Sequence, residues 1–574
     1  MLRAGHGLSV AIMLAIANET SENCGTELRS MKRILTVAAS AVLLAGAVST
    51  QASSADLIEN EPAAPQPAVV ESINWTGFHV GAGVGYGAAT QTGSVELYDR
   101  SLGGLLQVGP IDLYSIGLSA DMGGVGAIGT LEGGYDLQLG SSWVVGVSGD
   151  YTWSGIEGGA SIFGDVCYEY PLSGTNDSDD DCSSNVVSDR PDLTYTLNTG
   201  DSWSLIGRAG YLFTPATLIY GLGGYTHTSM EADITLSSDP TGSLEIASYS
   251  YDRDGWTLGA GIETIIANDV SLKLEYRATS WDESRNIPIG GEAGIRFEDE
   301  ALVQTFRGVL SWRPGAGGGN AAASANGGYE TASADWTGFH FGAGGGYGAS
   351  RQEGAVELFD RGPGGLIQVG PLDLYSIGAS NDFGGDGWIG AVDGGYDLRL
   401  GSSWVVGVAG DYSWSGVESK TSIFGDVCYE FPLSGTNDSD DDCSTNVVSD
   451  TPDLTYTWTT GDSWSVIGRV GYLATPKTLV YGLGGYTHTD MNIDLSINSD
   501  PATIELINNS YDRDGWTWGA GIETMIASNL SVKLEYRNTS WSESFTIPIG
   551  GDAGIKFSDD GMVQSVRAML SWRM

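Results

Sequence analysis

Apolar and polar residues alternate with a period of two through long stretches of this 574-residue chain. Val147 and Tyr151, for example, fall on one face of an extended chain, whereas Ser148 and Asp150 fall on the other. This period is typical of β-strands whose two faces meet different surroundings. We expect eight such strands in the first half of the chain, at approximately residues 75–89, 124–139, 143–156, 202–213, 217–230, 254–267, 270–282 and 301–313.

The second half of the chain repeats the first. The sequence Trp-Thr-Gly-Phe-His at residues 75–79 recurs at residues 336–340, and Leu-Ser-Trp-Arg at residues 310–313 recurs at residues 570–573. A repeat of this length is too long for a solenoid unit and corresponds to a whole domain. The question of the fold therefore reduces to one domain of about 240 residues that occurs twice.

Connections of two kinds alternate between the predicted strands. The short ones are tight turns at residues 139–142, 214–216 and 268–269, and the long polar ones lie at residues 90–123, 157–201, 231–253 and 284–300. Short turns at one end and long loops at the other are typical of outer-membrane barrels. We therefore predict an all-β fold of two tandem eight-stranded transmembrane antiparallel up-and-down β-barrels, with both termini of each copy on the periplasmic side.

One sixteen-stranded barrel with an open aqueous channel is the alternative to two small barrels. A soluble barrel with an apolar interior is a second alternative, because alternation alone does not say which face is inside. The Gly- and Ala-rich residues 314–334 are typical of a flexible linker, which favours two separate barrels.

Acidic and basic residues share one face of the predicted strands, so a nearly balanced set could neutralise itself inside a narrow lumen. The predicted lumen charge network comprises Glu132, Asp136, Asp150, Arg208, Glu263, Lys273, Glu275, Arg277 and Arg307 in the first copy, and Asp393, Asp397, Asp411, Arg469, Glu523, Lys533, Glu535, Arg537 and Arg567 in the second. Eight strands enclose an interior that side chains can fill, so we expect each lumen to be plugged.

The N-terminal residues predict export. Lys32 and Arg33 precede an uncharged run at residues 34–48 and then small residues, as in a secretory signal peptide, so Met31 is the expected start. The expected organisation is an upstream extension plus signal peptide at 1–55, a Pro/Ala-rich periplasmic segment at 56–73, barrel copy 1 at 74–313, a Gly/Ala linker at 314–334 and barrel copy 2 at 335–574.

Composition adds two constraints. A net charge of -46 argues against nucleic acid as a partner, because the chain offers no basic stripe to neutralise phosphates. The 17 Trp and 26 Tyr suit the aromatic girdles of a membrane barrel. The tryptophans expected near strand ends are Trp75, Trp143, Trp153, Trp203, Trp256, Trp281 and Trp312.

Four short motifs, at residues 75–83, 220–225, 259–263 and 274–277, resemble the alphaproteobacterial porin-like outer-membrane β-barrel proteins and outer-membrane immunogenic surface antigens. The resemblance covers both copies and implies insertion by the barrel assembly machinery into the outer membrane of a Gram-negative bacterium. It leaves function open, since members are described as structural, immunogenic, porin-like or haemin-binding. Members usually end on an aromatic residue, whereas this chain ends Trp572-Arg573-Met574.

Cysteines and acidic residues coincide in one long loop of each copy. The spacing predicts two local disulfides, Cys167 with Cys182 and Cys428 with Cys443, in an exported protein. The carboxylates between the cysteines offer the oxygen ligands that calcium takes, although a solvated acidic loop is the alternative. The candidate calcium ligands are Asp177, Asp179, Asp181, Asp438, Asp440 and Asp442.

The sequence shows no catalytic motif, so we expect no enzyme, and it implies no cofactor other than loop calcium. His79 and His227 are expected at opposite ends of the barrel, too far apart to ligate one haem. We predict a structural, envelope-stabilising or surface-binding protein whose acidic loops meet lipopolysaccharide or an extracellular partner. A sixteen-stranded porin and a haemin- or ligand-binding protein are the alternatives.

Overall fold

The computed structural model describes residues 73–99, 106–108, 111–113, 115–162, 167–169, 192–238, 242–267, 269–290, 293–315, 335–360, 367–369, 372–423, 429–430, 453–499, 502–551 and 553–574. Within these ranges, none of the chain forms a helix with the length and apolar character needed to cross a membrane.

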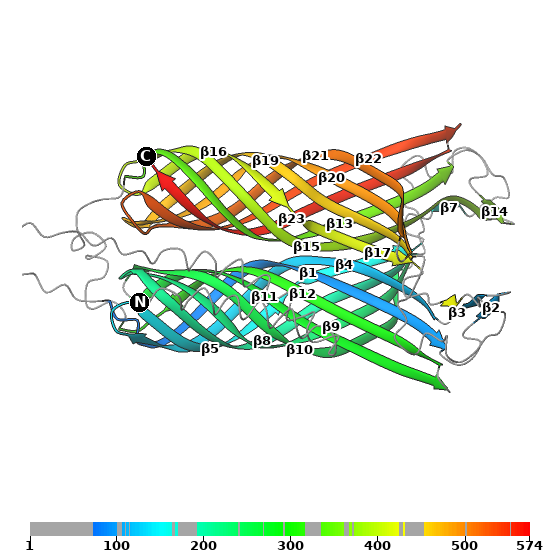
Figure 1. The fold of residues 1–574 in the computed structure, drawn as a ribbon, viewed down its shortest axis with the longest axis horizontal. Coiled ribbons are helices and arrows are strands. Elements are labelled where there is room, and N and C mark those ends of the chain that lie inside the picture. Colours follow the sequence, from blue (N-terminus) through cyan, green and yellow to red (C-terminus); the bar gives the residue numbers. More distant parts are fainter. Residues whose placement is uncertain are drawn as a thin grey trace, which may run out of the picture.

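The first copy closes on itself as a barrel of eight antiparallel strands (Figure 1). Its strands are β1 (Gly77–Asp99), β4 (Ser115–Leu139), β5 (Trp143–Ser154), β6 (Ile156–Ile162), β8 (Asp192–Thr214), β9 (Thr217–Ser238), β10 (Gly242–Ala267), β11 (Val270–Gly290) and β12 (Ala293–Trp312). Each pairs with the next, and β5 and β6 are two parts of one strand that both pair with β8. Strand β12 returns to pair with β1 from Val80↔Trp312 to Asp99↔Ala293, so neither strand is left as an edge.

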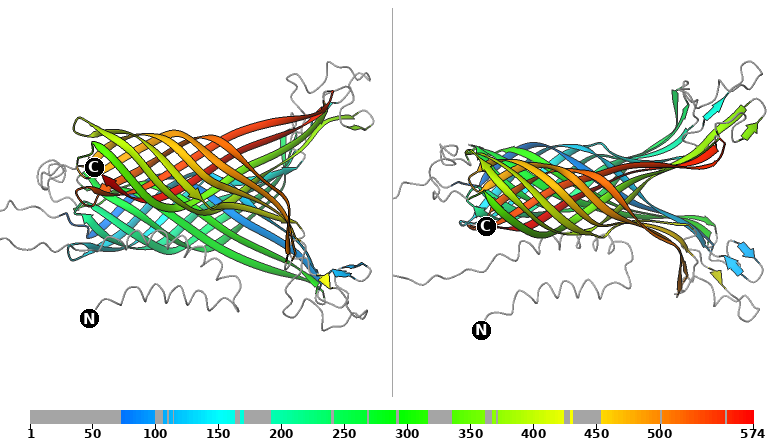
Figure 2. Two further views of the ribbon diagram at one scale, coloured as in Figure 1. Left: turned by 45° about the horizontal axis from the view of Figure 1, so that its top comes forward. Right: turned by 90° about the horizontal axis from the view of Figure 1, so that it is seen from above.

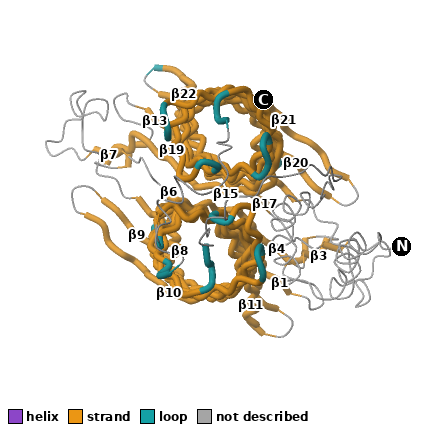
Figure 3. Tube along the Cα trace, turned by 90° about the vertical axis from the view of Figure 1, so that its left-hand side faces the viewer, coloured by secondary structure: helices purple, strands orange, loops and turns teal. Residues whose placement is uncertain are grey.

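The second copy repeats this closure with β13 (Gly338–Asp360), β15 (Leu372–Leu400), β16 (Trp404–Ser415), β17 (Val417–Ile423), β19 (Asp453–Thr475), β20 (Thr478–Ser499), β21 (Ala502–Met525), β22 (Leu530–Gly550) and β23 (Ala553–Arg573). Strand β13 pairs with both β15 and β23. The prediction of two tandem eight-stranded barrels is confirmed, and the sixteen-stranded alternative is wrong because each copy pairs its own first and last strands. Seen end-on, the two rings lie side by side (Figure 3).

The tight turns lie where the sequence predicts them, at residues 140–142, 215–216 and 269 in the first copy. The predicted long loops were partly wrong, because the strands continue far into them. Strand β1 runs on to Asp99, and residues 284–290 pair with residues 293–298, with Ile287 opposite Ile295. Figure 2 shows these extensions splaying at the end opposite the short turns. The ladder continues there because the extended residues still find backbone partners on the next strand.

Five short strands lie in these outer segments: β2 (Leu106–Val108), β3 (Ile111–Leu113), β7 (Cys167–Glu169), β14 (Ile367–Val369) and β18 (Tyr429–Glu430). Some of the extensions also pair between the two copies. Strand β15 pairs with β4, β6 and β7, and β17 pairs with β4. The two barrels are therefore joined by backbone hydrogen bonds at their outer ends.

The outward faces of the barrels carry exposed apolar side chains, and the inward faces carry buried charges. Trp143, Trp203 and Trp256 are 56%, 46% and 65% exposed on the outside, as a membrane girdle requires. This polarity is the reverse of a soluble barrel, so that alternative is wrong.

Two of the predicted girdle tryptophans instead point inward. Trp75 is 1% exposed because it precedes β1 and folds into the short-turn mouth of the lumen, where its Nε1 donates to the Pro215 carbonyl at 3.0 Å. Trp281 is 3% exposed because it shares the inward face of β11 with Arg277. Distance from a strand end therefore does not identify a girdle residue unless the face is also known.

Equivalent outward faces of the two barrels pack against each other. The buried cluster between them contains Ile262, Leu274, Tyr276, Ala278, Leu302 and Phe306 from the first copy and Ile522, Leu534, Tyr536 and Val566 from the second. The rings of Phe306 and Tyr536 stack with centroids 5.1 Å apart, and Thr217 Oγ1 lies 3.4 Å from its counterpart Thr478 Oγ1. Contacts between matching positions indicate an approximate twofold axis along the barrels.

We predict that cysteines at residues 217 and 478 will cross-link the barrels. Because the two hydroxyls face each other at 3.4 Å, the double variant Thr217→Cys, Thr478→Cys in a background with the native cysteines replaced by serine should form a disulfide. After proteolysis at a site inserted in the linker, a non-reducing gel should show the two halves still joined.

A matched control uses Val147→Cys with Val408→Cys, because these equivalent side chains are 52% and 55% exposed on β5 and β16, strands on the far sides of the two barrels (Figure 1). That pair should not cross-link within one chain. Equal cross-linking of both pairs, or of neither, would contradict the packing described above.

Candidate functional site

The lumen of the first barrel is crossed by a group of four charged residues near the short turns. Arg208 on β8 donates to Asp136 on β4, Nε to Oδ1 at 2.9 Å, and to Glu263 on β10, Nη1 to Oε2 at 2.9 Å. Arg313, directly after β12, donates to the same two carboxylates at 2.7 and 2.8 Å. All four side chains are buried. The group therefore ties four parts of the barrel wall together across its interior.

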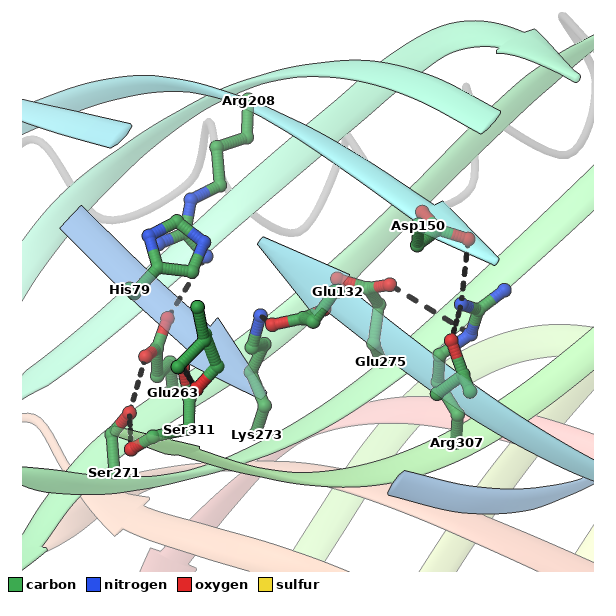
Figure 4. Close-up of polar contacts among 12 residues, drawn as sticks. His79, Glu132, Asp150, Arg208, Glu263, Ser271, Lys273, Glu275, Arg307 and Ser311 are labelled. Carbon is green, nitrogen blue, oxygen red and sulfur yellow. Dashed lines mark hydrogen bonds and ion pairs between the residues drawn. The ribbon is translucent and has the colours of Figure 1, made fainter. Parts of the chain in front are cut away.

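A second group of charges continues the network toward the outer end: Glu132, Asp150, Lys273, Glu275, Arg277 and Arg307. Arg277 donates to Asp150 at 2.7 Å and to Glu275 at 2.5 Å, and Lys273 pairs with Glu132. Arg307 Nη1 lies 3.5 Å from Asp150 Oδ1. Figure 4 shows the side chains of Glu132, Asp150, Lys273, Glu275 and Arg307 converging from different strands.

The second barrel repeats the network at every position. Arg469 bridges Asp397 and Glu523, Lys533 pairs with Asp393, and Arg537 pairs with Asp411 and Glu535. Arg567 and Arg573 complete the set. The structure thus places all eighteen predicted lumen residues inside the barrels, in two groups of nine that follow the two copies.

Arg313 and Arg573 were not among the lumen residues predicted from the sequence. Both residues lie at the ends of the last strands and share the parity of Arg307 and Arg567, a signal that could have identified them. With them, the described lumen of the first copy holds five acids (Glu132, Asp136, Asp150, Glu263, Glu275) and five bases (Arg208, Lys273, Arg277, Arg307, Arg313). Charge balance is therefore complete where the prediction left one acid in excess.

One glycine in each barrel makes room for the charge network. An ideal Cβ built on Gly146 would lie 2.0 Å from Asp136 Oδ1, and one on Gly407 would lie 2.0 Å from Asp397 Oδ1. A side chain at either position would displace the carboxylate that two arginines share. Glycine is needed at these two positions because the carboxylate lies so close to the backbone. No turn requires it, since both residues lie within strands.

Apolar layers lie on both sides of the charges. The layer at the short-turn end comprises Trp75, Val144, Ile206, Leu212, Leu218, Tyr220, Leu222 and Ile265. The layer at the outer end comprises Ile128, Ile156, Leu197, Met230, Trp281, Ala301 and Val303. Between charges and outer layer, Thr226, Thr257 and Thr279 form a hydrogen-bonded row beside a cavity of about 30 Å³. That volume is close to the share of one liquid water molecule.

The two histidines of the first copy lie on opposite sides of the barrel wall. His79 is buried in the lumen, with Nδ1 3.3 Å from Asp136 Oδ2. His227 is on the outside of β9, with Nδ1 2.7 Å from Asp254 Oδ1. They cannot ligate one haem, which agrees with the expectation from the sequence.

The predicted loop sites fall largely outside the described residues. Cys182, Cys428, Cys443 and all six candidate calcium ligands lie there, and of Cys167 only the backbone is described. The two disulfides and the calcium site therefore stay predictions.

The profile of the outer membrane protein beta-barrel domain family matches this chain twice, at residues 38–313 and 300–573. The chain belongs to this family. It is 27% identical over 241 residues to a 31 kDa outer-membrane immunogenic protein of Brucella melitensis, covering 41% of this chain and 83% of that protein. It is 30% identical over 177 residues to a 22 kDa outer membrane protein of Rhizobium leguminosarum bv. viciae, covering 30% of this chain and 62% of that protein.

Among solved structures, the attachment invasion locus protein Ail of Yersinia pestis aligns with 14% identity over 40% of this chain and 99% of that chain, at a TM-score of 0.17 that supports no conclusion. The family match and the relatives place this barrel protein in the outer membrane of a Gram-negative bacterium.

We predict that Arg208→Met will strongly destabilise the first barrel. The variant leaves Asp136 and Glu263 buried with one fewer cation, and breaking a buried ion pair by removing one partner typically costs about 3–5 kcal/mol. Urea unfolding of the protein in lipid vesicles, followed by loss of the heat-modifiable gel band, should show this fall in the free energy of unfolding.

The matched control is Lys477→Met, since Lys477 is exposed in a short turn of the second copy and its loss should change stability by less than about 0.5 kcal/mol. A loss below about 1 kcal/mol for Arg208→Met would mean that Arg313 alone neutralises the two carboxylates.

Proposed function

We propose that this protein is a structural and surface-exposed component of the outer membrane whose two lumens do not pass solutes. The observation that carries the proposal is the buried charge network in each barrel, which links four strands or strand ends through Arg208 and Arg313 alone. A path for solutes would have to break several of these ion pairs at once. Such pairs are costly to break within a low-dielectric interior.

The apolar layers support the same proposal. Trp75 in the short-turn mouth and Trp281 in the outer layer are 1% and 3% exposed, so a large ring fills the lumen on each side of the charges. Trp336 at 0% and Trp541 at 6% occupy the matching positions in the second barrel. An interior that eight strands enclose is of the size that side chains fill.

The alternatives have less support. The porin hypothesis requires one barrel of sixteen strands, whereas each copy closes separately as a barrel of its own. The haemin reading gains no shared site from the described histidines, because His79 and His227 lie on opposite sides of the wall. We also propose no catalytic role, since the buried acids are paired with arginine or lysine and the relatives are named as outer-membrane proteins.

The outer strand extensions are the part of the molecule suited to contact with the surroundings. They project beyond the barrels at the end opposite the short turns, which is the extracellular end of such barrels (Figure 2). We propose that these extensions and the acidic loops they carry meet lipopolysaccharide through divalent cations, or an extracellular partner. Pairing between β15 and β4, β6 and β7 supports this role, because it holds the extensions of both barrels as one surface.

We predict that the refolded chain will be silent in a planar bilayer. With its lumens filled by paired charges and aromatic rings, the protein should give no uniform conductance steps. The measurement is single-channel recording on protein shown to be folded by heat-modifiable gel mobility, with a known porin in the same bilayer to show that fusion occurs.

Large uniform steps from folded protein would overturn the proposal. The double variant Trp281→Gly, Trp541→Gly serves as a check, since it removes a ring from the outer layer of each lumen. Small steps from that variant alone would locate the barrier in the layers described above.

A further inference from the structure

Four ligand-bearing residues lie together on the outside of the second barrel. His488 and Asp490 are on β20, and they are directly opposite Asp514 and Asp512 on β21. Alternate residues of a strand point to the same face, so all four side chains project outward. The next pair on the same face, nearer the membrane, is Tyr486 opposite Trp516, whose side chain is 72% exposed. The cluster therefore lies on the water side of the outer aromatic row.

The imidazole of His488 is held in one orientation. Its Nδ1 lies 2.8 Å from Asp514 Oδ1, and its ring packs on the indole of Trp464 with centroids 5.6 Å apart. Asp514 also accepts a hydrogen bond from the Tyr486 hydroxyl. A proton on Nδ1 donated to Asp514 leaves Nε2 with its lone pair directed away from that carboxylate.

Nε2 faces the other two carboxylates. It lies 3.9 Å from Asp490 Oδ1 and 3.9 Å from Asp512 Oδ2, and one ligand atom from each of the three residues falls within 4.8 Å of the others. A metal ion about 2.0–2.2 Å from each of these donors in tetrahedral geometry needs donor separations of about 3.3–3.6 Å, so the two carboxylates must move closer to Nε2 and to each other. Asp490 and Asp512 have side chains 60% and 66% exposed, so they are free to close by that amount.

We propose that His488, Asp490 and Asp512 form a binding site for a divalent first-row transition-metal ion, with Asp514 as the positioning residue that orients the histidine. One imidazole nitrogen with two carboxylates is a donor set for ions of the zinc class, whereas calcium and magnesium take oxygen ligands. A carboxylate hydrogen-bonded to the far nitrogen of a ligating histidine is the usual outer partner of such a site. Three protein ligands leave a coordination position open to water.

The first copy contains the same arrangement with one ligand missing. His227 Nδ1 lies 2.7 Å from Asp254 Oδ1, and Nε2 lies 3.9 Å from Asp252 Oδ1. The residue that corresponds to Asp490 is Ser229, opposite Asp252, and its hydroxyl donates to the Asp201 carbonyl at 3.2 Å. The chain thus carries its own control, identical in the histidine and two carboxylates and different in the third ligand.

The experiment titrates the refolded full chain with Co²⁺, whose visible absorption reports coordination by nitrogen and oxygen. The cysteines are replaced by serine, and excess Ca²⁺ is present to occupy sites made of oxygen ligands alone. The parent chain, which keeps Ser229 and Asp490, should bind one equivalent of Co²⁺, and added Zn²⁺ should displace this Co²⁺. Asp490→Ser, which makes the second copy like the first, should weaken this binding by about tenfold or more.

The reciprocal variant Ser229→Asp should add a second equivalent with a similar spectrum, because it supplies the missing ligand next to His227. Asp514→Asn should retain binding at about 10- to 100-fold lower affinity, as expected of a positioning residue. Heat-modifiable mobility shows that each variant is folded. The proposal is overturned if Asp490→Ser binds Co²⁺ as the parent does, or if folded Ser229→Asp gains no second equivalent.

Discussion

The hydrocarbon of a membrane offers no hydrogen-bond partner to a peptide group, and the closure of both barrels follows from that constraint. A strand that crosses the bilayer must have its backbone paired on both sides, which only a closed barrel provides. Each copy satisfies the constraint by itself, because β1 pairs with β12 from Val80↔Trp312 to Asp99↔Ala293, and β13 pairs with β23 from His340↔Arg573 to Asp360↔Ala553. Closure with eight strands then fixes a narrow interior.

The acidic and basic side chains inside a narrow polar lumen must balance one another in charge. The described lumen of each copy holds five acids and five bases, joined so that Arg208 or its counterpart Arg469 reaches two carboxylates on different strands. Their burial would be unfavourable for any unpaired member, so balance matters more than the strength of a single pair. The apolar layers around Trp75 and Trp281 lie on both sides of these charges.

The outward surface shows a second constraint, because part of it faces the other barrel instead of lipid. Gln304, Gln564 and Asn538 point outward yet are 6%, 6% and 1% exposed, buried where the barrels meet. Polar amides would be unfavourable against hydrocarbon and are accommodated here because Gln304 accepts from the Tyr276 hydroxyl and Gln564 donates to the Gly87 carbonyl. Differences between the copies, such as Ser229 against Asp490, then mark where two otherwise equivalent surfaces have diverged.

The sequence by itself determined the strands, the short turns, the duplication and the sorting of Glu132, Lys273 and Arg277 to one face, because the period of two and the turn residues are local properties of the chain. It left open which face was inside, and it misplaced Trp75, since only the folded barrel shows the chain turning into its own mouth. It also did not place His488 beside Asp512, because that proximity depends on the register between β20 and β21. Register and closure are set by pairing along whole strands, so the tertiary structure alone decided the number of barrels, the partners of each charge and the face on which the two copies meet.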